Sequence, residues 1–142
     1  MFASDEEALA AAEEAYGKYL ETVTTVLADG GRSPDRLLEY VSAELFARDL
    51  PGYQTFAKNH WRATGHISFT MQPQQVDSIL GDLVVYTCED RTYFDVVDEN
   101  DLSVLPDRQM ARSAFEVSLD WTGASLVIID QESWTGGGIC RD

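Results

Sequence analysis

The sequence has few cysteines, few basic residues and no long apolar segment. Its 142 residues include two cysteines, and 10 lysines and arginines stand against 25 acids, giving a formal net charge of −15. This balance excludes binding to nucleic-acid backbones, which repel an acidic chain, and favours a basic partner. The longest apolar run is far shorter than the roughly 18–20 residues of a membrane span, so no span is predicted.

Targeting and catalytic motifs are also scarce. The residues from Met1 to Asp5 lack the basic and apolar regions of a signal peptide, which leaves two interpretations: a cytoplasmic protein, or the mature part of an exported one. We find no nucleophile elbow, no phosphate-binding loop and no zinc-ligand spacing. The acids from Asp95 to Asp101 lack the spacing of an EF-hand and are interpreted as a polar turn. No cofactor and no metal are therefore predicted.

The two cysteines bear on the compartment. Cys88 lies in a strand-like stretch, and Cys140 follows the glycines 136–138 near the end of the chain. A glycine-rich tail frays unless it is tied down, so a disulfide between Cys88 and Cys140 is predicted. Such a bond indicates an oxidising compartment, and thus an extracellular or cell-envelope protein. The alternative is two unrelated free thiols in a cytoplasmic protein.

The pattern predicts helices between about residues 4 and 63. Ser4 is the expected cap of the first helix, with Glu7 completing a capping box, and the glycines after Asp29 end it. A second helix is expected to start at Ser33-Pro34, and a third to run from about Pro51 to Ala63. The apolar stripe of the first helix is predicted to comprise Leu9, Ala12, Tyr16, Leu20, Val23 and Leu27.

The period changes from 3.6 to 2 after Gly65, which predicts a sheet over about residues 66–134 and a tail over 135–142. Strands are expected at 67–71, where Pro73-Gln74 bends or ends the strand, at 83–90 continuing or restarting at 93–97, at 115–121 and at 126–134. A loop is expected around Pro106-Asp107. Helices followed by antiparallel strands indicate one α+β domain spanning residues 1–142. Its N-terminal helices pack on one face of a curved antiparallel sheet.

This order of elements resembles the nuclear-transport-factor-2-like, or cystatin-like, cone superfamily. The resemblance is closest to small exported proteins and lipoproteins of actinobacteria. It is carried by residues 14–20 of the first helix, by the strand segments 84–90 and 94–98, and by the C-terminal segment 134–140. The resemblance implies a domain outside the cell, anchored in many relatives by a lipid on an N-terminal cysteine that this sequence lacks. Most members of this branch have no assigned activity.

The resemblance also implies a pocket between the helices and the concave face of the sheet. Four weak candidates for chemistry in that pocket are Tyr16, as an oxyanion donor, His60, as a general base, and the acids Asp90 and Asp95. An acid in an apolar pocket has a raised pKa and suits proton transfer. For each candidate the simpler interpretation is structural: a core tyrosine, a helix-end histidine and surface acids.

Three functional hypotheses follow. The first is a non-catalytic exported or cell-envelope domain that binds a small ligand or a protein partner in or beside the cone pocket. The second is a small isomerase- or cyclase-type enzyme that uses pocket acids and Tyr16. The third is a structural module that forms homodimers through the outer face of its sheet. The absence of a catalytic constellation favours the first hypothesis.

Overall fold

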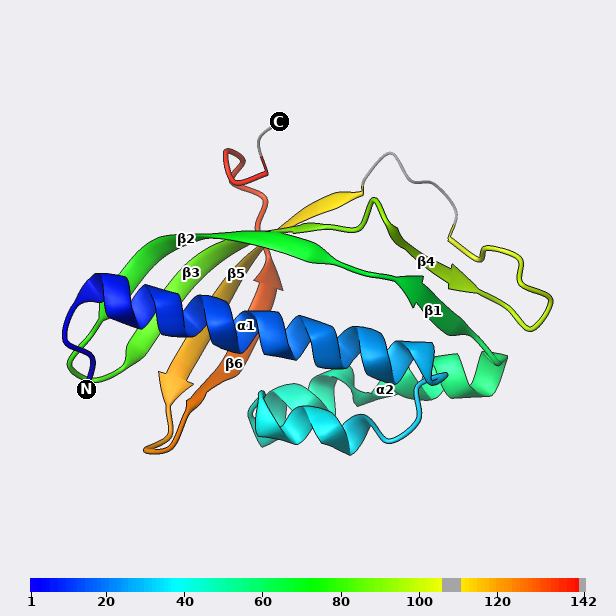
Figure 1. Cartoon of the computed structure of the whole chain (residues 1–142), viewed down its shortest axis with the longest axis horizontal. Helices are drawn as coiled ribbons and strands as arrows, with labels where there is room; N and C mark the ends of the chain where they lie inside the picture. Colours follow the sequence, from blue (N-terminus) through cyan, green and yellow to red (C-terminus); the bar gives the residue numbers. More distant parts are fainter. Residues whose placement is uncertain (106–110, 141–142) are drawn as a thin grey trace.

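The computed structural model describes residues 1–105 and 111–140 and has an α+β fold (Figure 1). The helices come first: α1 (Asp5–Ala28), the short 3-10 helix η1 (Pro34–Glu39) and α2 (Ala43–Asn59). The strands follow: β1 (Arg62–Gly65), β2 (Ser68–Asp77), β3 (Asp82–Asp90), β4 (Phe94–Val97), β5 (Arg112–Trp121) and β6 (Leu126–Ser133). The loop expected around Pro106-Asp107 lies outside the described residues.

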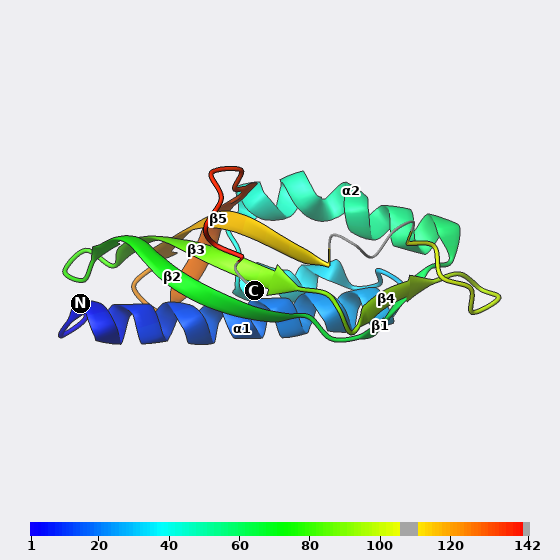
Figure 2. The ribbon, with the colours of Figure 1, turned by 90° about the horizontal axis from the view of Figure 1, so that it is seen from above.

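The strands form a curved antiparallel sheet in the order β2-β3-β5-β6, together with a separate ribbon in which β1 pairs with β4. Both helices lie on the same side of the sheet, below it in Figure 1, and Figure 2 shows the β1–β4 ribbon at the end opposite the N-terminus. Pro73 marks a register shift within β2, which bends the strand as expected without ending it. The predicted α+β class, with N-terminal helices on a curved antiparallel sheet, is confirmed.

Helix α1 starts as predicted. The Ser4 hydroxyl accepts a hydrogen bond from the Glu7 amide at 3.1 Å, and the Glu7 carboxylate accepts one from the Ala3 amide at 2.7 Å. The buried face differs slightly from the expected stripe. Its buried residues are Ala8, Ala12, Tyr16, Tyr19, Leu20 and Val26, whereas Leu9, Val23 and Leu27 pack half-buried beside them. The helix is therefore rotated toward Tyr19, because its apolar stripe is wider than one row of side chains.

The second and third expected helices were placed wrongly. The Ser33 hydroxyl caps nothing, and the helix after Pro34 is only η1. The chain then pairs with β6, because the Ser42 amide donates to the Ile128 carbonyl and the Ile128 amide donates to the Tyr40 carbonyl, both at 2.9 Å. Helix α2 starts after Ser42, whose hydroxyl caps it at 3.2 Å. Pairing with a strand distant in sequence thus overrides the local helical pattern.

The other errors in the predicted bounds of α2 arise at Pro51 and His60. Pro51 was interpreted as a helix start, but it lies inside α2. The helix ends at Asn59 rather than Ala63, because His60 takes a left-handed conformation with φ of 57°. Trp61 then hydrogen-bonds back to Phe56, and the chain enters β1. This early ending brings His60 and the start of β1 next to the loop that follows α1.

The core fills the space between the helices and the sheet. Tyr16 and Leu20 of α1 face Leu83, Val85 and other apolar residues of the strands, all nearly inaccessible to solvent. A second, smaller cluster of Ala63, Phe94 and Val96 lies on the paired strands β1 and β4 and packs against Leu27 and Phe56 of the helices. Within the described residues, no helix combines the length and the apolar character that crossing a bilayer requires.

The C-terminal tail is tied to the sheet as predicted. Cys88 in β3 and Cys140 form a disulfide, with 5.1 Å between their Cα atoms and a sequence separation of 52. Trp134 packs on Tyr86 with ring centroids 4.8 Å apart, and its indole donates to the Gly137 carbonyl at 3.3 Å. The tail therefore rests on the outer face of β3, because side chains alternate along a strand and the neighbours of Cys88 point toward α1.

Candidate functional site

Two polar regions of the molecule are candidate sites. The first is a buried cluster between α1 and the sheet, which we call the interior cluster and which comprises Tyr16, Thr87, Glu89 and Gln131. The Tyr16 hydroxyl donates to the Glu89 carboxylate and accepts a hydrogen bond from the Gln131 amide at 2.7 Å. Gln131 also donates to Glu89 at 3.2 Å, and Thr87 lies 3.5 Å from the Tyr16 oxygen. Arg91 closes the cluster by donating to Glu89 at 2.5 Å.

Burial controls the acid–base properties of the interior cluster. Tyr16 and Glu89 are 0% and 2% exposed, so water barely reaches either group. Burial raises the pKa of Glu89, and hydrogen bonds from Tyr16 and Gln131 with the charge of Arg91 only partly oppose this. Burial and the neighbouring Glu89 charge likewise raise the pKa of Tyr16. No buried side-chain polar atom in the described part of the chain lacks a partner, so the cluster is closed and satisfied.

Glu89 was missed by the sequence analysis, which singled out Asp90 instead. Along β3, Leu83, Val85, Thr87 and Glu89 alternate toward the core. The opposite face of the same strand carries Val84, Tyr86 and Cys88 and is also apolar, because the tail covers it. Alternation alone therefore could not decide which face is internal, and the acid on the inner face was passed over.

The structure does not bring the four sequence candidates together. Tyr16 is in the interior cluster, whereas Asp90 ends β3 on the opposite face of the sheet. The Thr92 hydroxyl and amide donate to Asp90, with Arg112 3.5 Å away, and these contacts lower the pKa of Asp90, which disfavours a role as general acid. Asp95 lies in β4, where it accepts hydrogen bonds from the Val96 amide and the Ser103 hydroxyl, each at 2.7 Å.

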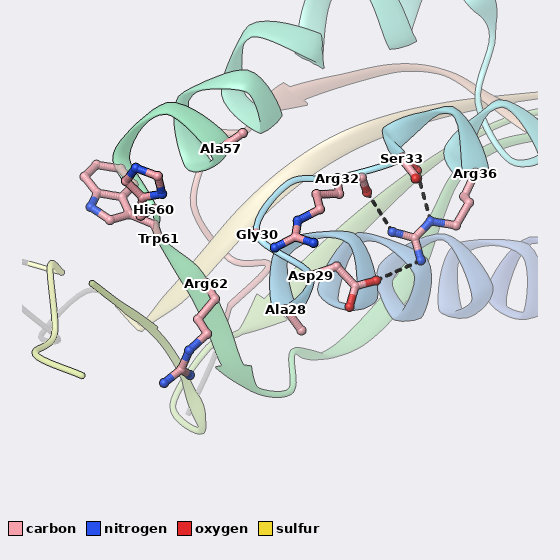
Figure 3. Close-up of a pocket in the computed structure, with 10 residues that line it drawn as sticks. All are labelled: Ala28, Asp29, Gly30, Arg32, Ser33, Arg36, Ala57, His60, Trp61 and Arg62. Atoms are coloured by element: carbon pink, nitrogen blue, oxygen red, sulfur yellow. Dashed lines mark hydrogen bonds and ion pairs between the residues drawn. The ribbon is translucent and has the colours of Figure 1, made fainter. Parts of the chain in front are cut away.

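His60, the fourth candidate, borders the second region, an open depression that we call the basic hollow. It has a volume of about 810 Å³ and lies between the end of α1, the start of η1 and the end of α2 (Figure 3). Its charged and aromatic lining comprises Asp29, Arg32, Arg36, His60, Trp61 and Arg62. The hollow therefore lies beside the cone interior rather than in it, and it contains only His60 of the four candidates.

The loop after α1 explains why the lining residues lie around one depression. Gly30 and Gly31 both have positive φ and reverse the chain after α1. A Cβ atom at Gly31 would lie 2.2 Å from the Tyr53 carbonyl oxygen, so only glycine permits the loop to pack against α2. This contact holds Arg32 and the end of α2 on two sides of one depression.

The arginines of the basic hollow differ in how they are held. Arg36 is fixed by three hydrogen bonds: to Asp29 at 3.0 Å, to the Ser33 carbonyl at 2.9 Å and to the Arg32 carbonyl at 2.7 Å (Figure 3). Arg62 pairs with Asp101. No hydrogen bond or ion pair joins the Arg32 guanidinium or the His60 imidazole to any other residue in ranges 1–105 and 111–140. The hollow thus presents the open side chains of Arg32 and His60 next to two arginines that are paired with acids.

Backbone conformation marks the same region. In the described part of the chain, three residues other than glycine have positive φ: Ser33, His60 and Asp101, at 51°, 57° and 62°. Ser33 and His60 line the basic hollow, and Asp101 is the ion-pair partner of Arg62. Left-handed residues with a Cβ cost roughly 1–2 kcal/mol each, and such costs concentrate at functional sites.

Comparison with known proteins identifies no relative of this chain. The chain matches no protein-family model, and neither the curated proteins nor the solved structures give a significant match. The geometry of the two regions therefore carries the functional argument.

Proposed function

We propose that this chain is a non-catalytic binding domain of an exported or cell-envelope protein, and that it binds a small ligand in the basic hollow beside the cone. The observation that carries the proposal is the contrast in accessibility. The cone interior is filled by side chains such as Tyr16 and Leu83. The hollow is open, and its Arg32 and His60 side chains have no hydrogen-bond or ion-pair partner within residues 1–105 and 111–140. An open depression with a few convergent polar groups is typical of a ligand site.

Two further features support the proposal. The disulfide between Cys88 and Cys140 suits an oxidising compartment outside the cytoplasm. The volume of the hollow, about 810 Å³, falls within the range of roughly 300–1,000 Å³ that is common for small-molecule sites. The resemblance to exported cone-fold domains agrees with the first of these features.

The isomerase- or cyclase-type alternative depends on the interior cluster. Tyr16 and Glu89 form the kind of hydroxyl–carboxyl pair that proton transfer uses, and Glu89 has a raised pKa. Catalysis also requires a substrate within hydrogen-bond reach of these groups. Each of them is already saturated by its neighbours, and each is almost fully buried. The binding function therefore has the better support.

The proposal is tested by nuclear magnetic resonance on the uniformly ¹⁵N-labelled, oxidised protein. A panel of small aromatic compounds of different charge is titrated, and the amide and arginine side-chain signals are followed. We expect saturable shifts that concentrate on Gly30, Arg32 and His60. Shifts centred on Tyr16 and Glu89 would favour the catalytic alternative, and a panel without any localised shift would contradict a ligand site in the hollow.

A further inference from the structure

We infer that the ligand of the basic hollow is a small organic oxyanion, a carboxylate or a phosphate monoester with a flat apolar part. This inference deepens the proposed function and rests on it. The hollow gathers Arg32, Arg36 and Arg62, which are three of the chain's 10 basic residues, and Asp29 is the single acid in its lining. Arg36 pairs with Asp29 and Arg62 pairs with Asp101, so among the described residues the unpaired positive charge of the hollow is that of Arg32. This local charge is opposite in sign to the net charge of −15 of the chain.

The partners of the arginines also point to an anionic ligand. The chain has 25 acids for 10 bases, so acids are abundant enough to neutralise every base. Arg32 nevertheless has no acid or carbonyl partner among the described residues. Arg36 is oriented by Asp29 and two backbone carbonyls, and a guanidinium has five N–H donors, so part of its donor capacity stays available. Guanidinium groups match the paired oxygens of carboxylates and phosphates.

The other walls of the hollow specify the rest of the ligand. His60 and Arg32 line the same hollow from different segments, the end of α2 and the loop after α1, and His60 can add an N–H donor (Figure 3). The half-buried Trp61 packs edge-on against Phe56, with ring centroids 5.7 Å apart, and supplies an apolar wall. A ligand with one charged end and one flat apolar end satisfies both kinds of wall.

The net charge of the chain limits how many negative charges the ligand can carry. A polyanion approaching a chain of −15 is repelled over its whole length, whereas a small anion experiences mainly the local field of the hollow. The ligand is thus a small molecule with one or two charges. Both a carboxylate and a phosphate monoester meet this requirement, and the experiment includes one probe of each.

The test uses four aromatic probes of similar size at constant ionic strength: phenyl phosphate, benzoate, benzyl alcohol and benzylamine. We expect phenyl phosphate, benzoate or both to shift the Arg32 side-chain and His60 amide signals saturably, and we expect neither the alcohol nor the amine to do so. Tighter binding of phenyl phosphate would identify a phosphate ligand, and tighter binding of benzoate a carboxylate ligand. Shifts of these signals by the alcohol or the amine alone would overturn the oxyanion inference but leave the proposed function standing. An absence of shifts with all four probes would overturn both.

Substitutions separate a specific site from general attraction. Arg32→Gln is expected to weaken binding of the better anionic probe at least tenfold, because a charged donor pair is lost. Lys58→Gln removes the same charge from an exposed position on α2 outside the lining and is expected to change affinity less than twofold. Equal losses in the two variants would overturn the inference, since they would show only bulk attraction.

A second variant guards against a folding defect. His60→Gly removes the imidazole at a left-handed position that glycine favours, so the fold is expected to be retained. We expect a loss of affinity of threefold or more with an unchanged melting temperature or a higher one. Unchanged affinity in both Arg32→Gln and His60→Gly would contradict the assignment of the oxyanion to this end of the molecule.

Discussion

The interior cluster and the basic hollow are both polar, but the polar groups of the first are buried and paired, whereas Arg32 in the second is exposed and open. In the interior cluster, Glu89 is buried and receives donors from Tyr16, Gln131 and Arg91. In the hollow, Arg32 is exposed and has no partner among the residues described. A buried polar group must be satisfied within the protein, because leaving it unpaired costs about 1–3 kcal/mol. An exposed group pays no such cost, so its donors remain available to a ligand.

This comparison predicts different consequences for the same type of substitution. Changes in the interior cluster, or in the sheet that covers it, should alter the stability of the fold and leave binding in the hollow unchanged. Changes in the hollow should alter binding and have little effect on stability. The following predictions test the first half of this comparison, from the largest expected effect to the smallest.

Removing the disulfide should have the largest effect on stability. The bond between Cys88 and Cys140 spans a sequence separation of 52, and closing such a loop stabilises by about 4 kcal/mol in the chain-entropy model. We expect the double variant Cys88→Ser/Cys140→Ser to lose about that much free energy of unfolding, measured by urea denaturation. Its Arg32 and His60 signals should match those of the oxidised protein, because neither β3 nor the tail lines the hollow. If the Arg32 and His60 signals changed in a variant that still folds, the two regions would be coupled, which would contradict the comparison.

Tyr16→Phe should have the next largest effect. The substitution removes the hydroxyl that contacts Glu89 and Gln131 and leaves both groups short of a partner in a buried site. We expect a loss of about 2 kcal/mol in the free energy of unfolding. Tyr93→Phe is the matched control, since Tyr93 is 73% exposed, and it should change stability by less than about 0.5 kcal/mol. Equal effects of the two variants would show that the interior cluster contributes nothing particular.

The pH dependence of stability gives the finest test. Burial raises the pKa of Glu89 above its ordinary value of 4.5, so the folded chain holds this proton more tightly than the unfolded chain does. The stabilisation from the protonated group is fully present below about pH 4.5, and it is lost as the pH rises through the raised pKa. Glu89→Gln mimics the neutral group and should abolish this loss.

The measurement is the free energy of unfolding of the protein and of Glu89→Gln at several pH values between 4 and 8. The difference between them should change with pH in favour of the variant as the pH rises. Glu13→Gln carries the same charge change at an exposed position of α1, so it corrects for the general repulsion among the acids. A pH profile of Glu89→Gln that parallels that of Glu13→Gln would show that Glu89 titrates like a surface acid.

Much of the fold followed from local patterns. The Ser4–Glu7 cap and the bend at Pro73 depend on short-range chemistry. The disulfide between Cys88 and Cys140 spans 52 residues, but the type and position of the two residues were enough to predict it. The boundary between the second and third helices did not follow, because the segment from Tyr40 to Ser42 pairs with Ile128, which is distant in the sequence. Local propensity cannot register a hydrogen-bond partner that folding supplies from another element.

The candidate site was less accessible to sequence reasoning. Tyr16 and His60 were identified, but they lie in different regions. Glu89, which pairs with Tyr16, and Arg32, which lines the hollow with His60, were not identified. Both faces of β3 are apolar, so periodicity could not locate the inner face and Glu89 with it. The arginines of the hollow come from three segments, around residues 32, 36 and 62, and no spacing in the sequence indicates that they converge.

The sequence by itself determined the α+β class, the acidic character and the pair of cysteines, because composition, periodicity and capping act over a few residues. The tertiary structure alone decided which polar groups are buried and paired and which are exposed to a ligand. The glycine turn at Gly31 packs on the carbonyl of Tyr53, and the left-handed His60 ends α2 early. Together they set three positive side chains around one depression of an otherwise acidic protein. Electric fields and accessibility depend on distances in space, which the order of residues along the chain does not contain.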